Sequence, residues 1–356
     1  MIEKSIKNIA WNVTEEEYRA DKAKSYSTLS RFAREGVSCI PHLMDKIDSE
    51  PLRFGSLVDT VMTDASELDN KFMIVDFPKP TESIVKIVTA IWENSDKKTN
   101  ILAKIDPQTI LMHAGNEDYQ KNWKEETKIN KIVFEGQGYF ELLALTEGKM
   151  VVTQSDLGLA EGCRDNLKSS NYTSKYFYDN PMKPNVEGHY QLKFKFTFIL
   201  DGITYHVRCM FDRIIVDHEA KTIQPLDLKT TGKPEEEFSH SFLQWRYDLQ
   251  ATMYSWILAK VCKEDDYFKD FTILPFKFIC INRYNQKPLV WTYKDSLICS
   301  ERFGVDGIKY KSWYTLLKEL TWHIDNNKLD YSYEVYQQQG EMELDNLFLE
   351  EIWKKH

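Results

Sequence analysis

Residues 223–232 read I-Q-P-L-D-L-K-T-T-G, and this stretch decides how the rest of the chain is interpreted. In an extended strand, alternate side chains point to opposite faces, so Asp227 and Lys229 share one face while Leu226 and Leu228 share the other. An acid and an amine that are buried between apolar neighbours lose hydration free energy. The pair is therefore either a structural ion pair inside a sheet or part of a chemical site.

The sequence around this stretch has the alternation of β-strands. From residue 191, the segment 186–200 places four large apolar side chains on one face: Leu192, Phe194, Phe196 and Phe198. Asp201-Gly202 is a strong signal for a tight hairpin turn. The segments 203–217 and 222–230 continue as two further strands, joined through a turn at 218–221. We therefore predict a three-stranded antiparallel meander.

Helical patterns surround the meander. We expect helices at 26–36, 53–63, 79–92, 234–261 and 314–324, a strand followed by a helix over 149–167, and a strand at 274–282. The predicted fold is α/β, with a central mixed β-sheet that contains the meander and is flanked by helices. Because no repeat or low-complexity linker marks a boundary, we expect one domain over 1–356, comprising a mostly helical part (1–150), a catalytic sheet and helix (185–285) and a helical end (286–356).

Composition narrows the class of protein. The 356 residues are 42% hydrophobic and 28% charged, which is typical of a globular protein. No apolar run is long enough to span a bilayer and the N-terminus has no hydrophobic signal region, so we expect a cytoplasmic protein without membrane contact. Six cysteines without a CxxC pair predict reduced core thiols and neither structural zinc nor an iron–sulfur cluster.

Charge argues against one kind of nucleic-acid protein. The formal net charge is −9 and the pI is about 5.5, which excludes a broad basic surface that coats nucleic acid. A local basic groove remains compatible with this balance. The sequence has no phosphate-binding P-loop, GxGxxG, GxSxG or HExxH motif, so nucleotide-hydrolase, dinucleotide, serine-hydrolase and zinc-protease chemistry find no support.

Two acids are expected to meet in the meander. Asp212 lies in the second strand and Asp227 in the third, so pairing of the strands through the 218–221 turn would bring both carboxylates to one edge beside Lys229. Two carboxylates in a low-dielectric place repel each other unless a cation lies between them. Oxygen ligands select a hard ion such as Mg²⁺ or Mn²⁺, which activates water and stabilises charge on a phosphate. The lysine would position the water, assist its deprotonation or offset the developing charge.

This pattern resembles the PD-(D/E)xK nuclease superfamily, and four motifs direct it to the RecB-like and RecE-like branch. Asp212 matches the acid that ends one strand, and residues 227–230 (D-L-K-T) match "DxKT" on the next. Residues 55–59 (G-S-L-V-D) resemble the earlier "GxxxH", and 250–254 (Q-A-T-M-Y) match "QxxxY". The opening S-T-L-S-R-F-A-R-E-G-V-S-C-I-P (27–41) is similar to that of RecE-type phage exonucleases.

The resemblance implies a restriction-endonuclease-like core and a Mg²⁺- or Mn²⁺-dependent deoxyribonuclease with two ions. Its nearest implied activity is that of a phage RecE-like 5′→3′ exonuclease, which degrades duplex DNA ends to single strands for recombination in the cytoplasm of a bacterial or phage-infected cell. A single-strand annealing protein and a homo-oligomer are implied partners. The carried-over residues are catalytic Lys229, Asp212 and Asp227, metal-binding Asp59, Asp212, Asp227, Leu228 (through its carbonyl) and Glu187, and DNA-binding Gln250, Tyr254, Arg208 and Lys233.

Several alternatives stay open on the sequence. Asp59 stands where the family has histidine, and Gln191 competes with Glu187 for the upstream position. Gln250 and Tyr254, one helical turn apart, also fit ordinary helix packing. The nearby basic residues fit either a phosphate-tracking groove or solvated strand edges: Lys193, Lys195, Arg208, Arg213, Lys233 and Arg246. An endonuclease or flap nuclease, or an inactive DNA-binding or phage assembly protein, remains an alternative function.

Overall fold

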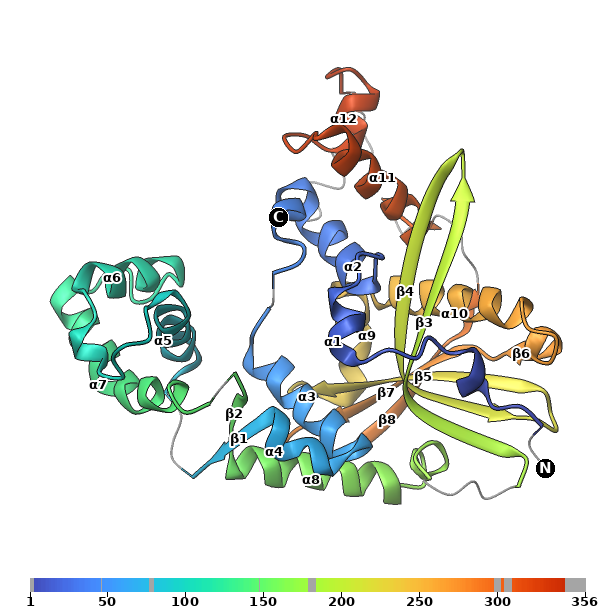
Figure 1. Ribbon diagram of the computed structural model, residues 1–356, viewed down its shortest axis with the longest axis horizontal. Helices are drawn as coiled ribbons and strands as arrows, with labels where there is room; N and C mark the ends of the chain where they lie inside the picture. The colour runs from blue at the N-terminus through green and yellow to red at the C-terminus, as the bar shows by residue number, and fades with distance from the viewer. Residues whose placement is uncertain are drawn as a thin grey trace. The chain divides into compact units, whose positions relative to one another are not determined.

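The computed structural model describes residues 3–45, 47–76, 80–146, 148–178, 184–297, 302–303 and 309–342 (Figure 1). The chain divides into two compact units. Unit 1 comprises Met1–Lys46, Leu167–Asn282 and Lys287–His356, and unit 2 comprises Ile47–Asn166 and Arg283–Gln286. The sequence does not reveal this division because one junction falls inside a continuous helix, α8 (Gln154–Ser169), instead of in a polar linker.

Unit 1 is built on a six-stranded mixed sheet. The strand order is β3-β4-β5-β7-β8, with β6 paired to β5. The β3–β4, β4–β5 and β7–β8 pairs are antiparallel, whereas β5 pairs in parallel with β6 and β7. This confirms the predicted meander and the mixed α/β sheet. The strands are β3 (Val186–Leu200), β4 (Ile203–Asp217), β5 (Thr222–Thr231), β6 (Thr272–Ile273), β7 (Phe276–Asn282) and β8 (Pro288–Tyr293), and a separate two-stranded sheet pairs β9 (Arg302–Phe303) with β10 (Lys309–Tyr310).

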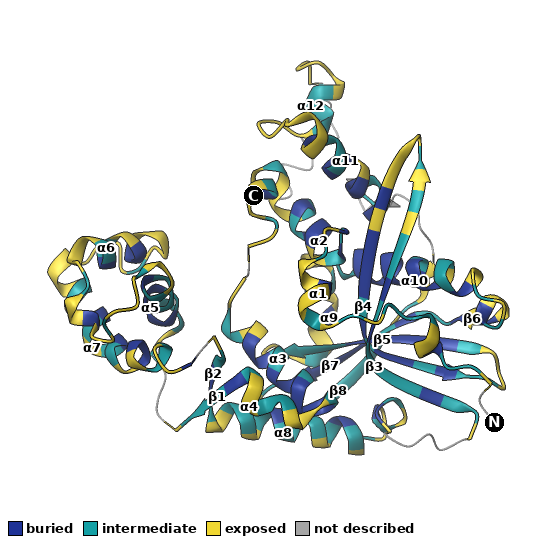
Figure 2. Ribbon diagram, in the orientation of Figure 1, coloured by how far each residue is buried: buried dark blue, intermediate teal, exposed yellow. Residues whose placement is uncertain are grey.

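The β3–β4 hairpin turns at the predicted dipeptide. Asp201 and Gly202 have φ values of 50° and 78°, and two successive left-handed residues are what a two-residue turn of the I′ type requires. Glycine at the second position adopts this φ without steric cost. The end of the hairpin is exposed, whereas the central strands are buried (Figure 2).

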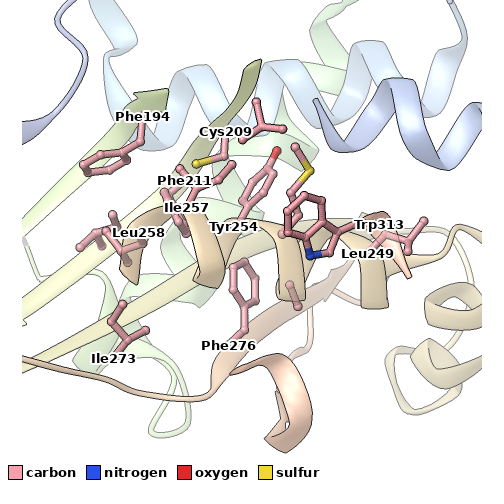
Figure 3. Close-up of a cluster of buried hydrophobic side chains, with 14 of the residues drawn as sticks. Phe194, Cys209, Phe211, Leu249, Tyr254, Ile257, Leu258, Ile273, Phe276 and Trp313 are labelled. Carbon is pink, nitrogen blue, oxygen red and sulfur yellow. The ribbon is translucent and has the colours of Figure 1, made fainter. Parts of the chain in front are cut away.

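Unit 1 contains six α-helices among the described residues. They are α1 (Glu15–Ala20), α2 (Tyr26–Glu35), α9 (Phe238–Gln244), α10 (Tyr247–Lys263), α11 (Trp313–Asn326) and α12 (Tyr333–Gln337). Thr14 and Glu17 form a capping box at the start of α1. Helix α10 packs on β3 and β4, and its buried face joins the aromatic side chains of the sheet in the main core (Figure 3).

Two predicted elements differ from the structure. The single helix expected over 234–261 is broken between α9 and α10, where Arg246 adopts a left-handed φ of 56°. Its guanidinium is held by Asp248 and by the Lys311 carbonyl, so a tertiary contact from a distant segment fixes the break. The part after residue 286 was expected to be helical, but it begins with the edge strand β8, which pairs with β7.

Unit 2 is mainly helical. Its elements are α3 (Glu50–Thr63), α4 (Leu68–Lys71), β1 (Phe72–Val75), α5 (Glu82–Asn94), α6 (Pro107–Asn116), α7 (Glu125–Leu143) and β2 (Met150–Thr153), followed by most of α8. Strands β1 and β2 pair in parallel. The helix predicted at 53–63 is confirmed as part of α3, and its apolar side chains are buried: Phe54, Leu57, Val58, Val61 and Met62.

Two further expectations concern the cysteines and membrane-spanning helices. Five cysteines are free and buried, as predicted, while Cys299 lies outside the described residues. Among the helices that the structure describes, none is both long and apolar enough to cross a membrane.

Candidate active site on strands β4 and β5

The two predicted acids meet where strands β4 and β5 diverge. The regular pairing ends at Arg213 and Leu226, so Asp212 and Asp227 occupy the next opposed positions. Opposed residues of an antiparallel pair project to the same face of the sheet. In place of the next backbone bond, the Asp212 carboxylate accepts a hydrogen bond of 2.7 Å from the Leu228 N–H. The side chain of Asp212 therefore continues the ladder at the point where the backbones separate.

Asp227 is the centre of a buried polar cluster. Its carboxylate is 3% exposed and lies 2.6 Å from the Lys229 ammonium. The other carboxylate oxygen accepts a hydrogen bond from the Gln250 side-chain amide, which projects from α10. The alternation of the strand places Asp227 and Lys229 on one face, as the sequence predicted, and α10 supplies the neutral donor that the buried acid needs.

Lys229 is held in its charged form. Burial alone disfavours a charged amine, but the Asp227 carboxylate, with smaller contributions from Tyr247 and Asp212, holds the pKa of Lys229 above its ordinary value. The amine also lies 4.5 Å from the centroid of the Tyr247 ring, at a distance typical of a cation–π contact. The first residue of α10 thus forms one wall of the site.

The donor atoms of this site suit a hard cation. The N–H and C=O of one strand residue point to the same edge, so the Leu228 carbonyl, like its N–H, faces β4. Two carboxylates and one carbonyl are the oxygen ligands that Mg²⁺ or Mn²⁺ accepts. Within the described ranges, no three His, Cys, Asp or Glu side chains are grouped as a metal site. The described residues therefore offer an incomplete set of oxygen ligands for such an ion.

Glu187 is not part of this cluster. It pairs with Val216, four residues from Asp212 along β4, which corresponds to about 13 Å. Its carboxylate accepts hydrogen bonds from the Ile6 N–H (2.7 Å) and the Ser5 hydroxyl (2.6 Å), and both His189 and His218 lie beside it. The prediction of Glu187 as a metal ligand is corrected, because it lies this far along the strand from Asp212 and its carboxylate instead fixes the N-terminal segment.

The alternative at the upstream position has a different location. Gln191 lies between the paired positions Tyr190–Arg213 and Leu192–Phe211, so it is opposite Asp212 in the register. Its φ of 52° interrupts the regular strand there. Asp59 lies on α3 in unit 2, whereas the cluster of Asp212, Asp227 and Lys229 belongs to unit 1. Its role as a metal ligand stays a prediction.

Gln250 and Tyr254, predicted to contact DNA, have separate roles. Gln250 is 4% exposed and donates to Asp227, so it positions the acid. Tyr254 is 7% exposed and lies among the core side chains, with its ring 5.2 Å from that of Phe211 and 6.4 Å from that of Phe276 (Figure 3). Both residues are therefore buried instead of facing DNA; the packing alternative applies to Tyr254, whereas Gln250 binds Asp227.

Most of the predicted basic lining is engaged inside the protein. Arg208 is buried, donates to the Ala23 carbonyl and lies 4.6 Å from the Tyr18 ring, so its prediction as a DNA contact is corrected. Four others bind backbone carbonyls or carboxylates: Lys193, Lys195, Arg213 and Arg246. Lys233, in the loop after β5, is exposed and remains a predicted DNA contact.

One exposed pair beside the site was not predicted. Trp245, at the break between α9 and α10, is 41% exposed, and the Arg34 guanidinium lies 4.7 Å from the centroid of its ring. The Tyr26 hydroxyl donates to the Trp245 carbonyl at 2.6 Å. No local feature of the sequence signals the helix break at which Trp245 is exposed.

Comparisons with known proteins add no family. No family model matches the chain, and no curated protein matches it. Among solved structures, the crystal structure of SSO0001 aligns over 85% of this chain and 88% of its own, with 8% identity and a TM-score of 0.25. A similarity at this level does not establish a shared fold.

Proposed function

We propose that the protein is a metal-dependent deoxyribonuclease whose active site is formed by Asp212, Asp227 and Lys229. The observation that carries the proposal is the convergence of two carboxylates with a charged amine where β4 and β5 separate. The sheet needs an oxygen acceptor at position 212, but it does not need a second acid and an amine at positions 227 and 229, which concentrate charge at a buried place. Such groups cluster at sites that stabilise charge during a reaction.

Each residue of the site has a separate role in the proposed cleavage reaction. Asp212, Asp227 and the Leu228 carbonyl hold one divalent cation, which when bound lowers the pKa of water and offsets charge on the phosphodiester. Gln250 fixes the orientation of Asp227 through its amide hydrogen bond. Lys229, charged and anchored by Asp227 and Tyr247, donates to the attacking water or to a phosphate oxygen. Lys233 contributes positive charge to the DNA path.

The finer activity rests on the resemblance to RecE-type phage exonucleases. On this resemblance, the protein has a PD-(D/E)xK core with a second ion and forms a homo-oligomer. It digests duplex ends from 5′ to 3′ and passes the single strands to an annealing protein during recombination. Asp59 is the candidate ligand for the second ion. An endonuclease or a flap nuclease would use the same chemistry on a different DNA substrate: an endonuclease needs no free end, and a flap nuclease needs a branched one.

A catalytically inactive DNA-binding or phage assembly protein is the second candidate. One observation favours it: Lys229 is ion-paired with Asp227, and the described residues supply no third acid to the cluster. In that protein the same groups would form a structural ion pair. The two candidates therefore differ in whether DNA is cleaved when a metal ion is added.

Digestion of linear and closed circular DNA with Mg²⁺ or Mn²⁺ tests the proposal. An exonuclease removes linear DNA alone, and an endonuclease also cuts circles. Lys229→Ala should abolish cleavage, whereas Lys263→Ala, which removes an exposed lysine at the end of α10, should leave it unchanged. Cleavage by neither metal, or full activity of Lys229→Ala in a folded protein, would refute the assignment.

A further inference from the structure

Trp245 is exposed to solvent at the break between α9 and α10, where the backbone is held in place. Arg246, in its left-handed conformation, is held by Asp248 and by the Lys311 carbonyl, and its guanidinium lies 5.3 Å from the Tyr310 ring. Just before it, the Trp245 carbonyl accepts the Tyr26 hydroxyl. The Trp245 N–H also donates to the Ser241 carbonyl, so bonds on both sides of Trp245 keep its backbone in place while 41% of the residue stays exposed.

Arg34 covers part of this ring and keeps its own charge available. Its Nε donates to the Ser30 carbonyl, which directs the guanidinium of the exposed side chain over Trp245. Among the described carboxylates, none forms an ion pair with Arg34. It therefore differs from Lys195, which is paired with Asp21, and from Arg246, which is paired with Asp248.

The Trp245–Arg34 pair lies next to the candidate active site. Tyr26, which binds the Trp245 carbonyl, has its ring 6.2 Å from that of Tyr247. Tyr247 in turn lies 4.5 Å from the Lys229 ammonium. All of these residues belong to unit 1, and the Tyr26 and Tyr247 side chains connect Lys229 to the backbone of Trp245.

We propose that Trp245 and Arg34 form a stacking platform for an unpaired base of the DNA strand whose phosphodiester reaches Lys229. This inference rests on the proposed function, because only a nuclease would bring a phosphodiester of this strand to Lys229. The free surface of the indole stacks on the base, and the Arg34 guanidinium binds the adjacent phosphate. A paired base inside a duplex has both faces covered by its neighbours, so the platform selects a strand that has left the helix.

The chemistry of the pair favours a nucleotide over an apolar partner. Exposed aromatic rings next to unneutralised cations bind bases and phosphates of single strands, and stacking tolerates any base because each has a π-face. An apolar protein surface would instead leave the Arg34 charge buried without a counterion. Sequence-independent binding of one strand is also what a nuclease without base preference needs.

Fluorescence anisotropy with EDTA present tests the platform without cleavage. The probe is a fluorescein-labelled single DNA strand of about 12 nucleotides, and Trp245→Ala should raise its Kd about tenfold or more. Trp245→Phe should restore most of the affinity, because it keeps an aromatic face. Trp123→Ala is the matched control, since Trp123 in unit 2 is 40% exposed and should have no effect.

Two further measurements separate stacking from charge. On a strand of abasic sugar-phosphate, wild type and Trp245→Ala should bind equally. Arg34→Gln should reduce the slope of log K against log salt by about 0.7, the value for one phosphate of a single strand. Thermal unfolding of each variant should match that of wild type, because both side chains are exposed.

The outcomes distinguish this inference from the proposed function. If Trp245→Ala binds the strand as tightly as wild type, if it loses equal affinity for the abasic strand, or if wild type binds no single strand, the platform is refuted. Cleavage of linear DNA by wild type would then still support the nuclease. Conversely, binding that depends on Trp245 in a protein that cleaves nothing would keep the platform and refute the nuclease.

Discussion

Glu187→Gln is the sharpest test of how the sheet holds the N-terminal segment. The carboxylate of Glu187 accepts the Ile6 N–H and the Ser5 hydroxyl, and two histidines lie against it. Glutamine keeps the length of the side chain and one acceptor oxygen but removes the negative charge. The variant therefore isolates the contribution of charge to this anchor.

The magnitude follows from the pKa of this acid. Burial alone would raise it, but His189, the Ile6 amide and Ser5 hold the pKa of Glu187 at about 2, below the ordinary 4.5. At about 1.4 kcal/mol per pKa unit, this difference corresponds to about 3 kcal/mol of folding free energy. A lowered folded-state pKa stabilises the protein above the unfolded value, so the contribution is complete above about pH 5 and falls below half by about pH 3.

Urea unfolding followed by fluorescence measures this difference. We expect Glu187→Gln to lower the free energy of unfolding by about 2–3 kcal/mol near pH 7, and the gap to wild type to narrow towards pH 3. Hydrogen exchange should quicken at the Ile6 amide. Glu219→Gln, an exposed change in the following turn, is the control. Equal stability of Glu187→Gln and wild type near neutral pH, or a gap that does not change with pH, would refute the reasoning.

Three other changes separate structure from chemistry. Arg208→Met should lower stability by about 1–3 kcal/mol and speed proteolysis near α1, because the Ala23 carbonyl loses its donor; DNA affinity, measured by anisotropy, should not change. Gln250→Leu should lower both the unfolding free energy, by about 1–3 kcal/mol, and the cleavage rate, since buried Asp227 loses a hydrogen bond; an unchanged melting temperature would contradict this. Asp212→Asn should unfold like wild type in urea, because its amide oxygen still accepts the Leu228 N–H, whereas Asp212→Ala should be less stable and neither should cleave DNA.

The sheet and the acid pair were predictable because their signals are local. Alternation and the Asp201-Gly202 turn define the β3–β4 hairpin, and the short 218–221 turn sets the register that brings Asp212 opposite Asp227. The apolar run at 274–282 indicated a buried strand without any marker residue. In the structure this strand is β7, which pairs in parallel with β5.

What the sequence did not reveal depends on distant partners. Arg208 and Glu187 looked available for DNA or metal, but N-terminal residues bind both of them. The helix break at Arg246 is fixed by the Lys311 carbonyl, and no proline or glycine marks it. Strand β8 begins at a proline and is an edge strand, so its pattern carries little of the alternation that identifies a strand.

The hydrogen bond from the Leu228 N–H to Asp212 has a consequence for how this site would decay by mutation. A lineage that no longer needed the reaction would be free to change Lys229, because an amine can be lost together with the acid that it neutralises. Position 212 would still be under selection for an oxygen acceptor that closes the gap between the strands. In inactive descendants, asparagine should therefore replace Asp212 more often than other residues do. An amide at this position would identify a relative that keeps the fold but has lost the activity.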